Sequence, residues 1–93
     1  MIGRDGPDGK VRREQNREGH RRHLHKLIDD GSIVFAGPIR DDYDDHSTGA
    51  VIVLRADNLT RAREIVQSDP YVVGGVFESL EVNAFRQAIP ELP

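Results

Sequence analysis

The sequence predicts an α+β fold in which two helices cover one face of a four-stranded antiparallel sheet. Three observations lead to this expectation. Short runs of β-branched and aromatic residues alternate with stretches of helical spacing, in the order βαββαβ. Gly, Pro, Asp or Asn marks the junctions between these segments. The chain of 93 residues has the size of one domain, with no internal repeat.

The first strand and the first helix are separated by a turn. A short strand is expected at residues 1–4, because Asp5-Gly6-Pro7-Asp8-Gly9 favours turn geometry. A helix is expected from about Lys10 to Asp30, where Leu24, Leu27 and Ile28 have helical spacing. Gly31 is then placed as its C-terminal stop.

Two central strands follow. Residues 33–36 form a β-branched and aromatic run that Gly37-Pro38 is expected to end, and residues 50–54 form a second such run. A polar loop rich in Asp separates them. We expect the two strands to pair as a hairpin.

The last third of the chain contains a helix, a short helical turn and a strand. The helix is expected from Leu59 to Gln67, with Asn58 or Asp57 as its N-cap. Asp69-Pro70 has the composition of an N-cap followed by a first helical residue, and Gly74-Gly75 would close that turn. The final strand is expected at residues 76–85, and residues 86–93 are expected to form a tail. The complete order is that of a ferredoxin-like fold.

The predicted sheet is apolar on both faces. Ile33 and Phe35 alternate with Val34 and Ala36, and residues 50–54 are all apolar. Right-handed crossovers place both helices on one side, so the other face lacks a cover within the chain. A domain of this size also buries a thin core. We therefore expect a homodimer that packs through its sheet faces.

Composition excludes several classes of protein. The absence of Cys excludes disulfides, thiolate catalysis and Cys-ligated zinc. Residues 1–26 contain eight Lys or Arg against four Asp or Glu, but no aromatic residue, which argues against nucleic acid as the partner of this basic segment. No apolar run approaches the roughly 20 residues of a membrane span. We expect a cytoplasmic protein that binds neither nucleic acid nor membrane.

The first helix has a basic inward face. On a helical wheel of about 100° per residue, Arg13, Arg17 and His20 continue the stripe formed by Leu24 and Leu27. Charged side chains on a core-facing stripe need partners. One interpretation is structural, in which the arginines pair with Asp residues at the sheet edge and His20 is a hydrogen-bonded core residue. The other is a pocket that binds an anion at the arginines and exchanges a proton at His20.

No metal site or cofactor is expected. His20, His23 and His25 do not converge on one face of the helix. The loop at residues 41–46 lacks the alternating carboxylates and central Gly of a calcium loop. The glycines near the start lack the spacing and the Lys of a phosphate-binding loop.

The motifs together resemble those of the YciI-like family. They are, in order, His20-x-x-x-Leu24-x-x-Leu27-x-x-x-Gly31, Ala36-Gly37-Pro38, Asp69-Pro70-Tyr71-x-x-x-Gly75-Val76 and Val82-x-x-Phe85. Arg17 and Arg13, three and seven residues before His20, match as well. The chain departs from the family at its start, where a fuller first strand would be expected before Gly3.

The resemblance implies a single YciI-like domain over residues 1–93, with the fold of a dimeric α/β barrel. It implies an active-site pair formed by His20 and Asp69. It also makes Arg13, Arg17, Gly37, Pro38 and Tyr71 candidates for substrate binding. The family is similar in fold to muconolactone isomerases and antibiotic-biosynthesis monooxygenase domains, and it includes a dehydrochlorinase of a chlorinated hydroxyhydroquinone.

Two functions are compatible with these residues. The first is a lyase or isomerase without a cofactor, which moves a proton on a small anionic and ring-bearing metabolite. His20 would be the acid or base and Asp69 its orienting partner, while Arg13 and Arg17 would bind the anion. The second is a non-catalytic dimeric module that binds a ligand or assists a larger enzyme, in which Asp69 is only a helix cap.

Overall fold

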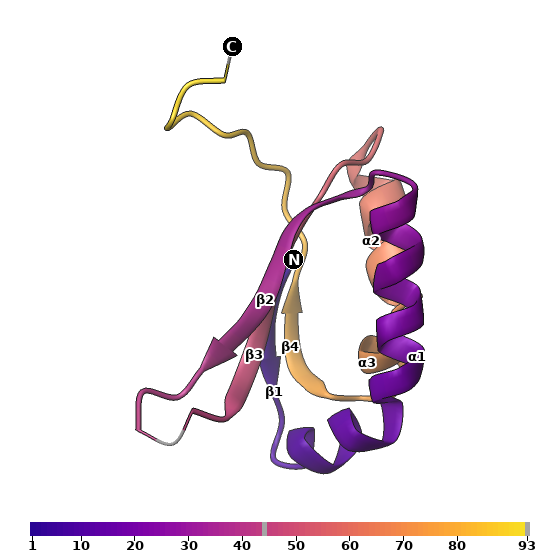
Figure 1. Cartoon of the computed structure of the whole chain (residues 1–93), viewed down its shortest axis with the longest axis vertical. Helices are drawn as coiled ribbons and strands as arrows, with labels where there is room; N and C mark the ends of the chain where they lie inside the picture. Colours follow the sequence, from indigo (N-terminus) through magenta and orange to yellow (C-terminus); the bar gives the residue numbers. More distant parts are fainter. Residues whose placement is uncertain (44, 93) are drawn as a thin grey trace.

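The computed structural model describes residues 1–43 and 45–92, and these form one sheet with three helices on one of its faces (Figure 1). The elements are β1 (Ile2–Asp5), α1 (Gly9–Asp29), β2 (Ile33–Arg40), β3 (Ser47–Leu54), α2 (Leu59–Gln67), α3 (Pro70–Val73) and β4 (Phe77–Glu81). The strand order is β2-β3-β1-β4, with every neighbouring pair antiparallel. The predicted ferredoxin-like α+β fold is confirmed.

Several strand boundaries differ from the prediction. β3 begins at Ser47 rather than at residue 50, and β1 extends to Asp5. β2 does not end at Gly37-Pro38 but continues to Arg40, with Pro38 opposite Ala50. A Pro is tolerated there because β2 is an edge strand, so the missing N–H faces no partner. β4 ends at Glu81 rather than at residue 85, because its only neighbour β1 begins at Ile2, the partner of Glu81.

Residues beyond β4 form the expected tail, which extends away from the body of the molecule (Figure 1). Residues 82–92 contain neither helix nor strand. The last residue of the predicted tail, Pro93, lies outside the described residues.

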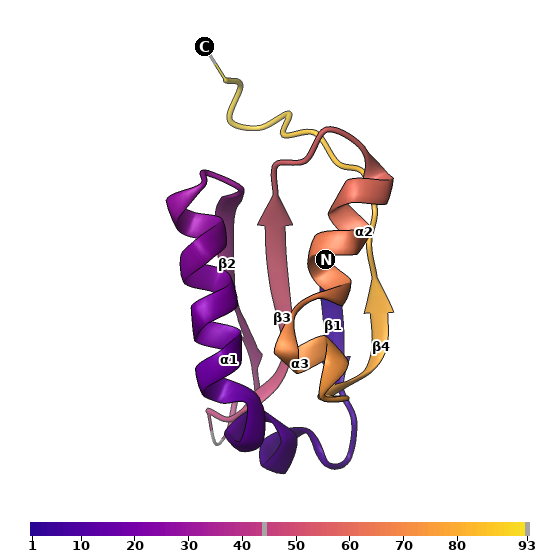
Figure 2. The same ribbon diagram turned by 90° about the vertical axis from the view of Figure 1, so that its right-hand side faces the viewer.

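The helices divide the covered face between them (Figure 2). α1 lies over the β2 side of the sheet, and α2 lies over the β1 and β4 side. α2 begins at Asn58, whose side chain accepts a hydrogen bond from the Arg61 N–H, as the sequence predicts. The core between the helices and the sheet contains Leu27, Ile52, Ile65, Val66, Tyr71 and Val76.

Two glycines let α1 approach α3 closely. A Cβ at Gly19 would be 3.2 Å from the ring of Pro70, and a Cβ at Gly74 would collide with the Asn16 side chain. Larger residues would therefore push the helices apart. This contact brings the middle of α1 over the start of α3, where the candidate site is formed.

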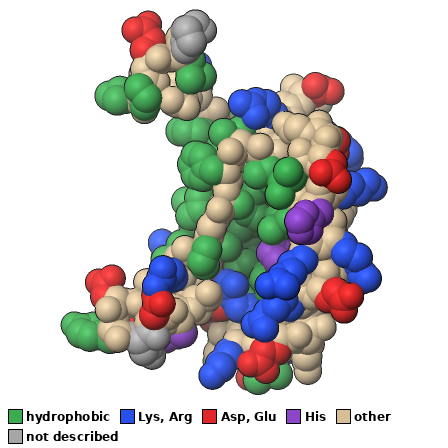
Figure 3. Space-filling model, viewed as in Figure 1, with side chains coloured by type: hydrophobic (Ala, Val, Ile, Leu, Met, Phe, Trp, Pro, Cys, Tyr) green, Lys and Arg blue, Asp and Glu red, His purple; other side chains and the backbone are tan. Residues whose placement is uncertain are grey.

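The opposite face of the sheet is apolar and open. Strand pairing places Ile2, Phe35, Val51 and Val53 on the face opposite the buried Ile52. Hydrophobic side chains gather in a hollow on this side, between the β2–β3 hairpin and the tail (Figure 3). Within the described residues, no helix has the length and apolar character needed to cross a membrane.

Candidate active site

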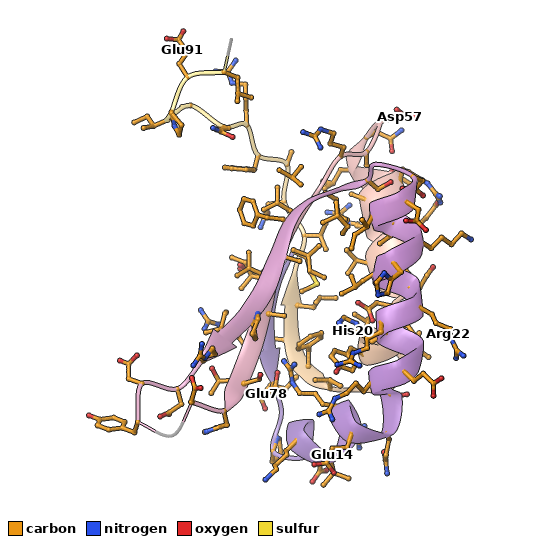
Figure 4. The ribbon with its side chains drawn as sticks, in the orientation of Figure 1. Glu14, His20, Arg22, Asp57, Glu78 and Glu91 are labelled. Atoms are coloured by element: carbon orange, nitrogen blue, oxygen red, sulfur yellow. The ribbon has the colours of Figure 1, made fainter. Side chains whose placement is uncertain are left out.

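His20 and Asp69 lie in direct contact under α1. The His20 Nδ1 and the Asp69 Oδ1 are 2.7 Å apart, and the two side chains are 16% and 3% exposed. His20 points from the middle of α1 toward the sheet (Figure 4). Asp69 is the N-cap of α3. Residues 49 positions apart in the sequence are thus brought together by the packing of α1 on α3.

Asp69 also caps the helix that follows it. Its Oδ1 accepts a second hydrogen bond from the Tyr71 backbone N–H, at 2.9 Å. One oxygen atom of Asp69 therefore both caps α3 and contacts His20.

The second ring nitrogen of His20 is free. Nε2 has no hydrogen-bond partner among the described residues. Every buried side-chain nitrogen or oxygen among these residues does have a partner, so Nε2 is not one of the buried atoms. Nε2 is therefore accessible to solvent. If Nδ1 carries the proton that it shares with Asp69, Nε2 has the lone pair needed to accept another.

Tyr71 lies against the His20 ring. The two ring centroids are 3.7 Å apart and the planes are inclined by 4°. Tyr71 is only 6% exposed, so little of it is available to a substrate. The structure thus brings this predicted substrate-binding residue to the site as a neighbour of the histidine.

Arg13 is held by the end of β1. Its Nε and Nη2 donate to the two oxygens of Asp5 at 2.7 and 2.9 Å, and Nη2 also donates to the Gly49 carbonyl at 3.1 Å. The hydrogen bond with Asp5 raises the pKa of the Arg13 guanidinium, against an opposing effect of burial. This is the pairing with an Asp at the sheet edge that the structural interpretation predicts. The Tyr71 side chain also interacts with Arg13 and further raises the pKa of its guanidinium.

Asp5 is the residue that sequence reasoning missed. The sequence places it in a turn, whereas it is the last residue of β1. Alternation along the strand puts Asp5 on the same face as Gly3, under the helices. A carboxylate on that face needs a cationic partner, and this was the available signal.

The other three predicted substrate-binding residues do not join the cluster. Arg17 is exposed and makes no hydrogen bond or ion pair with any described residue. Gly37 and Pro38 are exposed on the edge strand β2.

The described residues contain no group of three or more His, Cys, Asp or Glu that could hold a metal ion. Part of the acidic loop at residues 41–46, namely Asp44, lies outside the described residues. We therefore assign no metal ligands.

Comparisons with known proteins point to one family. The model of the YCII-related domain matches residues 1–86. Proteins named YciI from Escherichia coli O6:H1 and Shigella flexneri are each 30% identical over 92 residues, which is 94% of both chains. A solved structure of 5-chloro-2-hydroxyhydroquinone dehydrochlorinase from Burkholderia phenoliruptrix, in complex with 2,5-dihydroxybenzoquinone, superposes with a TM-score of 0.80. It is 22% identical and covers 95% of this chain and 96% of its own.

Proposed function

We propose that this protein is a small-molecule enzyme in which His20 and Asp69 transfer a proton without a cofactor. The chain belongs to the YCII-related domain family. The observation that carries the proposal is the 2.7 Å contact between His20 Nδ1 and Asp69 Oδ1, with Nε2 open to solvent. We expect the substrate to be a small anionic and ring-bearing metabolite, and the reaction to be of the lyase or isomerase type.

The chemistry follows from the two ring nitrogens. Asp69 accepts the Nδ1 proton, which fixes the tautomer and leaves Nε2 as the base. Nε2 removes a proton from the substrate, and the electron pair of the broken bond expels a leaving group or shifts within the substrate. The imidazolium then returns its proton to the product or to water, while the Asp69 carboxylate stabilises its charge.

The similar dehydrochlorinase supports this type of reaction. As its name states, it removes hydrogen chloride from a chlorinated hydroxyhydroquinone, a step that needs an acceptor for the proton. The exposed guanidinium of Arg17 is available to bind the negative charge of such a phenolic substrate. Arg13, which Asp5 holds beside Tyr71, adds positive charge to the same cluster.

The tautomer of His20 tests the proposal without knowledge of the substrate. In the neutral form of the imidazole, we expect nitrogen NMR to show the proton on Nδ1. Asp69→Ser keeps a residue that caps helices well but is too short to reach the ring, so this preference should be lost while the fold remains. A wild-type protein with its proton on Nε2 would refute the assignment of Nε2 as the base.

A second candidate function is a non-catalytic ligand-binding module. The observation that favours it is the hydrogen bond from the Tyr71 N–H, which gives Asp69 a sufficient structural role as a cap. If capping is its whole role, Asp69→Ser should retain every measurable activity or affinity of the protein. The proposed enzyme should lose its turnover in the same variant.

We further propose that two copies associate through their open sheet faces. Ile2 and Phe35 are exposed on this face, and both lie within an apolar surface that the chain leaves uncovered. Sedimentation equilibrium at micromolar concentration should show a dimer, and Phe35→Asp should dissociate it because a charge would enter the apolar interface. Tyr43→Asp, at a residue 98% exposed in the β2–β3 loop, is the matched control and should leave the dimer intact. A folded wild-type monomer would contradict the proposal.

A further inference from the structure

The stacking of Tyr71 on His20 has an unusual geometry for two neutral rings. The planes are nearly parallel and the centroids are 3.7 Å apart, whereas neutral aromatic rings prefer offset or edge-to-face arrangements. A cation above a ring face is attracted by the negative quadrupole of that face. A ring face held parallel at this distance can therefore stabilise the imidazolium more than it stabilises the neutral imidazole.

Tyr71 is fixed in this position from several sides. Its backbone N–H donates to Asp69 Oδ1, the oxygen that also contacts the histidine. The Arg13 guanidinium carbon lies 5.2 Å from the centroid of the Tyr71 ring, and Asp5 holds that guanidinium in turn. His20 thus has one fixed contact at its edge, with Asp69, and one across its face, with Tyr71.

We propose that Tyr71 is a positioning residue of the His20–Asp69 pair, whose ring face fixes the imidazole plane and stabilises the imidazolium that His20 forms on accepting a proton. This inference rests on the proposed function for its effect on turnover. Its effect on His20 itself does not depend on any substrate. The role differs from the substrate contact that the sequence motif suggests for Tyr71.

Charged groups are placed around the two rings. Asp69 contacts His20, and Arg13, held by Asp5, lies against the Tyr71 ring. Arg17 precedes His20 on α1 and is exposed. Tyr71 also interacts with Arg13 through its side chain. Tyr71→Phe removes the hydroxyl alone, so a comparison of Tyr71→Leu with Tyr71→Phe isolates the contribution of the ring face.

The experiment is a proton NMR titration of the four histidines, with the His20 signal assigned from a His20→Gln spectrum. Tyr71→Leu removes the ring face and should lower the measured pKa of His20 by roughly 0.5 to 1.5, the range expected for a cation–π contact. Tyr71→Phe keeps the ring and should leave the pKa close to that of the wild type. Tyr43→Leu makes the same change at an exposed tyrosine and should leave the His20 titration unchanged.

Turnover provides a second readout. The Tyr71→Leu variant should lose about 3- to 30-fold in kcat, with little change in KM, because the ring acts on the base rather than on the substrate. If Tyr71→Leu does not fold, Tyr71→Met supplies an apolar side chain of more similar length without a ring. An unchanged His20 pKa in a folded Tyr71→Leu or Tyr71→Met variant would overturn the inference, even if His20 proves essential. A lowered His20 pKa in a variant of a protein that shows no turnover would support this inference. Only the proposed function would then be contradicted.

Discussion

The His20→Gln variant is expected to lose roughly 10²- to 10⁴-fold in turnover while it remains folded, because this is the usual contribution of a positioned general acid or base. Gln keeps a polar side chain of similar length that can still hydrogen-bond Asp69, but it cannot take up a proton near neutral pH. A suitable first assay is chloride release from 5-chloro-2-hydroxyhydroquinone, the compound named for the structurally similar enzyme. Other phenolic anions would follow in the same assay.

His23→Gln is the matched control for this substitution. His23 lies one helical turn further along α1, and no hydrogen bond or ion pair joins it to any described residue. The same chemical change should therefore leave turnover within about twofold of the wild type, because His23 is only half-buried and takes no part in the His20–Asp69 contact. Equal losses in both variants would show that general damage to α1, rather than loss of a base, lowers the activity. A fully active His20→Gln protein would contradict the catalytic role.

The Asp5→Ala variant is expected to lose about 3 kcal/mol of unfolding free energy. Arg13 and Asp5 are 13% and 9% exposed at their side chains and are joined by two hydrogen bonds. Removal of one partner leaves a charge that is largely buried and uncompensated, a change that typically costs 3–5 kcal/mol. We take the lower end because the Gly49 carbonyl remains to accept a hydrogen bond from Arg13. Urea denaturation, followed by circular dichroism, measures the loss.

Asp8→Ala provides the comparison for this loss. Asp8 has a side chain 72% exposed and lies 3.9 Å from Arg12, so its removal should cost less than about 1 kcal/mol. Replacement of both buried partners, as in Asp5→Leu with Arg13→Met, should recover part of the stability, because no unpaired charge then remains. If Asp5→Ala is no less stable than Asp8→Ala, the buried pair does not stabilise the fold.

The sequence was sufficient for the order of the elements but not for all of their boundaries. Helix limits depend on local signals, and Asn58 and Asp69 act as the predicted caps. Strand limits depend on a neighbour. β4 stops at Glu81 because β1 offers no further residue, and β2 passes through Pro38 because it lies at the edge. Neither fact is visible in a local window of residues.

The candidate site, too, could be predicted only where it depends on local sequence signals. Helical spacing placed His20 on the inward face of α1, and the motif resemblance suggested Asp69 as its partner. The same spacing did not distinguish Arg13, which finds Asp5, from Arg17, which remains exposed. Their difference depends on where β1 ends relative to α1. The stack of Tyr71 on His20 depends on the close approach that Gly19 and Gly74 allow, and this too arises only in three dimensions.

The two members of the His20–Asp69 pair come from different halves of the chain. His20 belongs to the first βαβ unit and Asp69 to the second, 49 residues later. Such a contact closes a long loop, and its entropic cost is met only when both units have formed and docked. The pair is therefore a non-local contact, whereas α1 and the β2–β3 hairpin are formed from local segments of the chain. A polypeptide emerging during synthesis has the histidine long before it has the carboxylate, so the chemistry proposed for this pair can begin only once nearly the whole domain has been made.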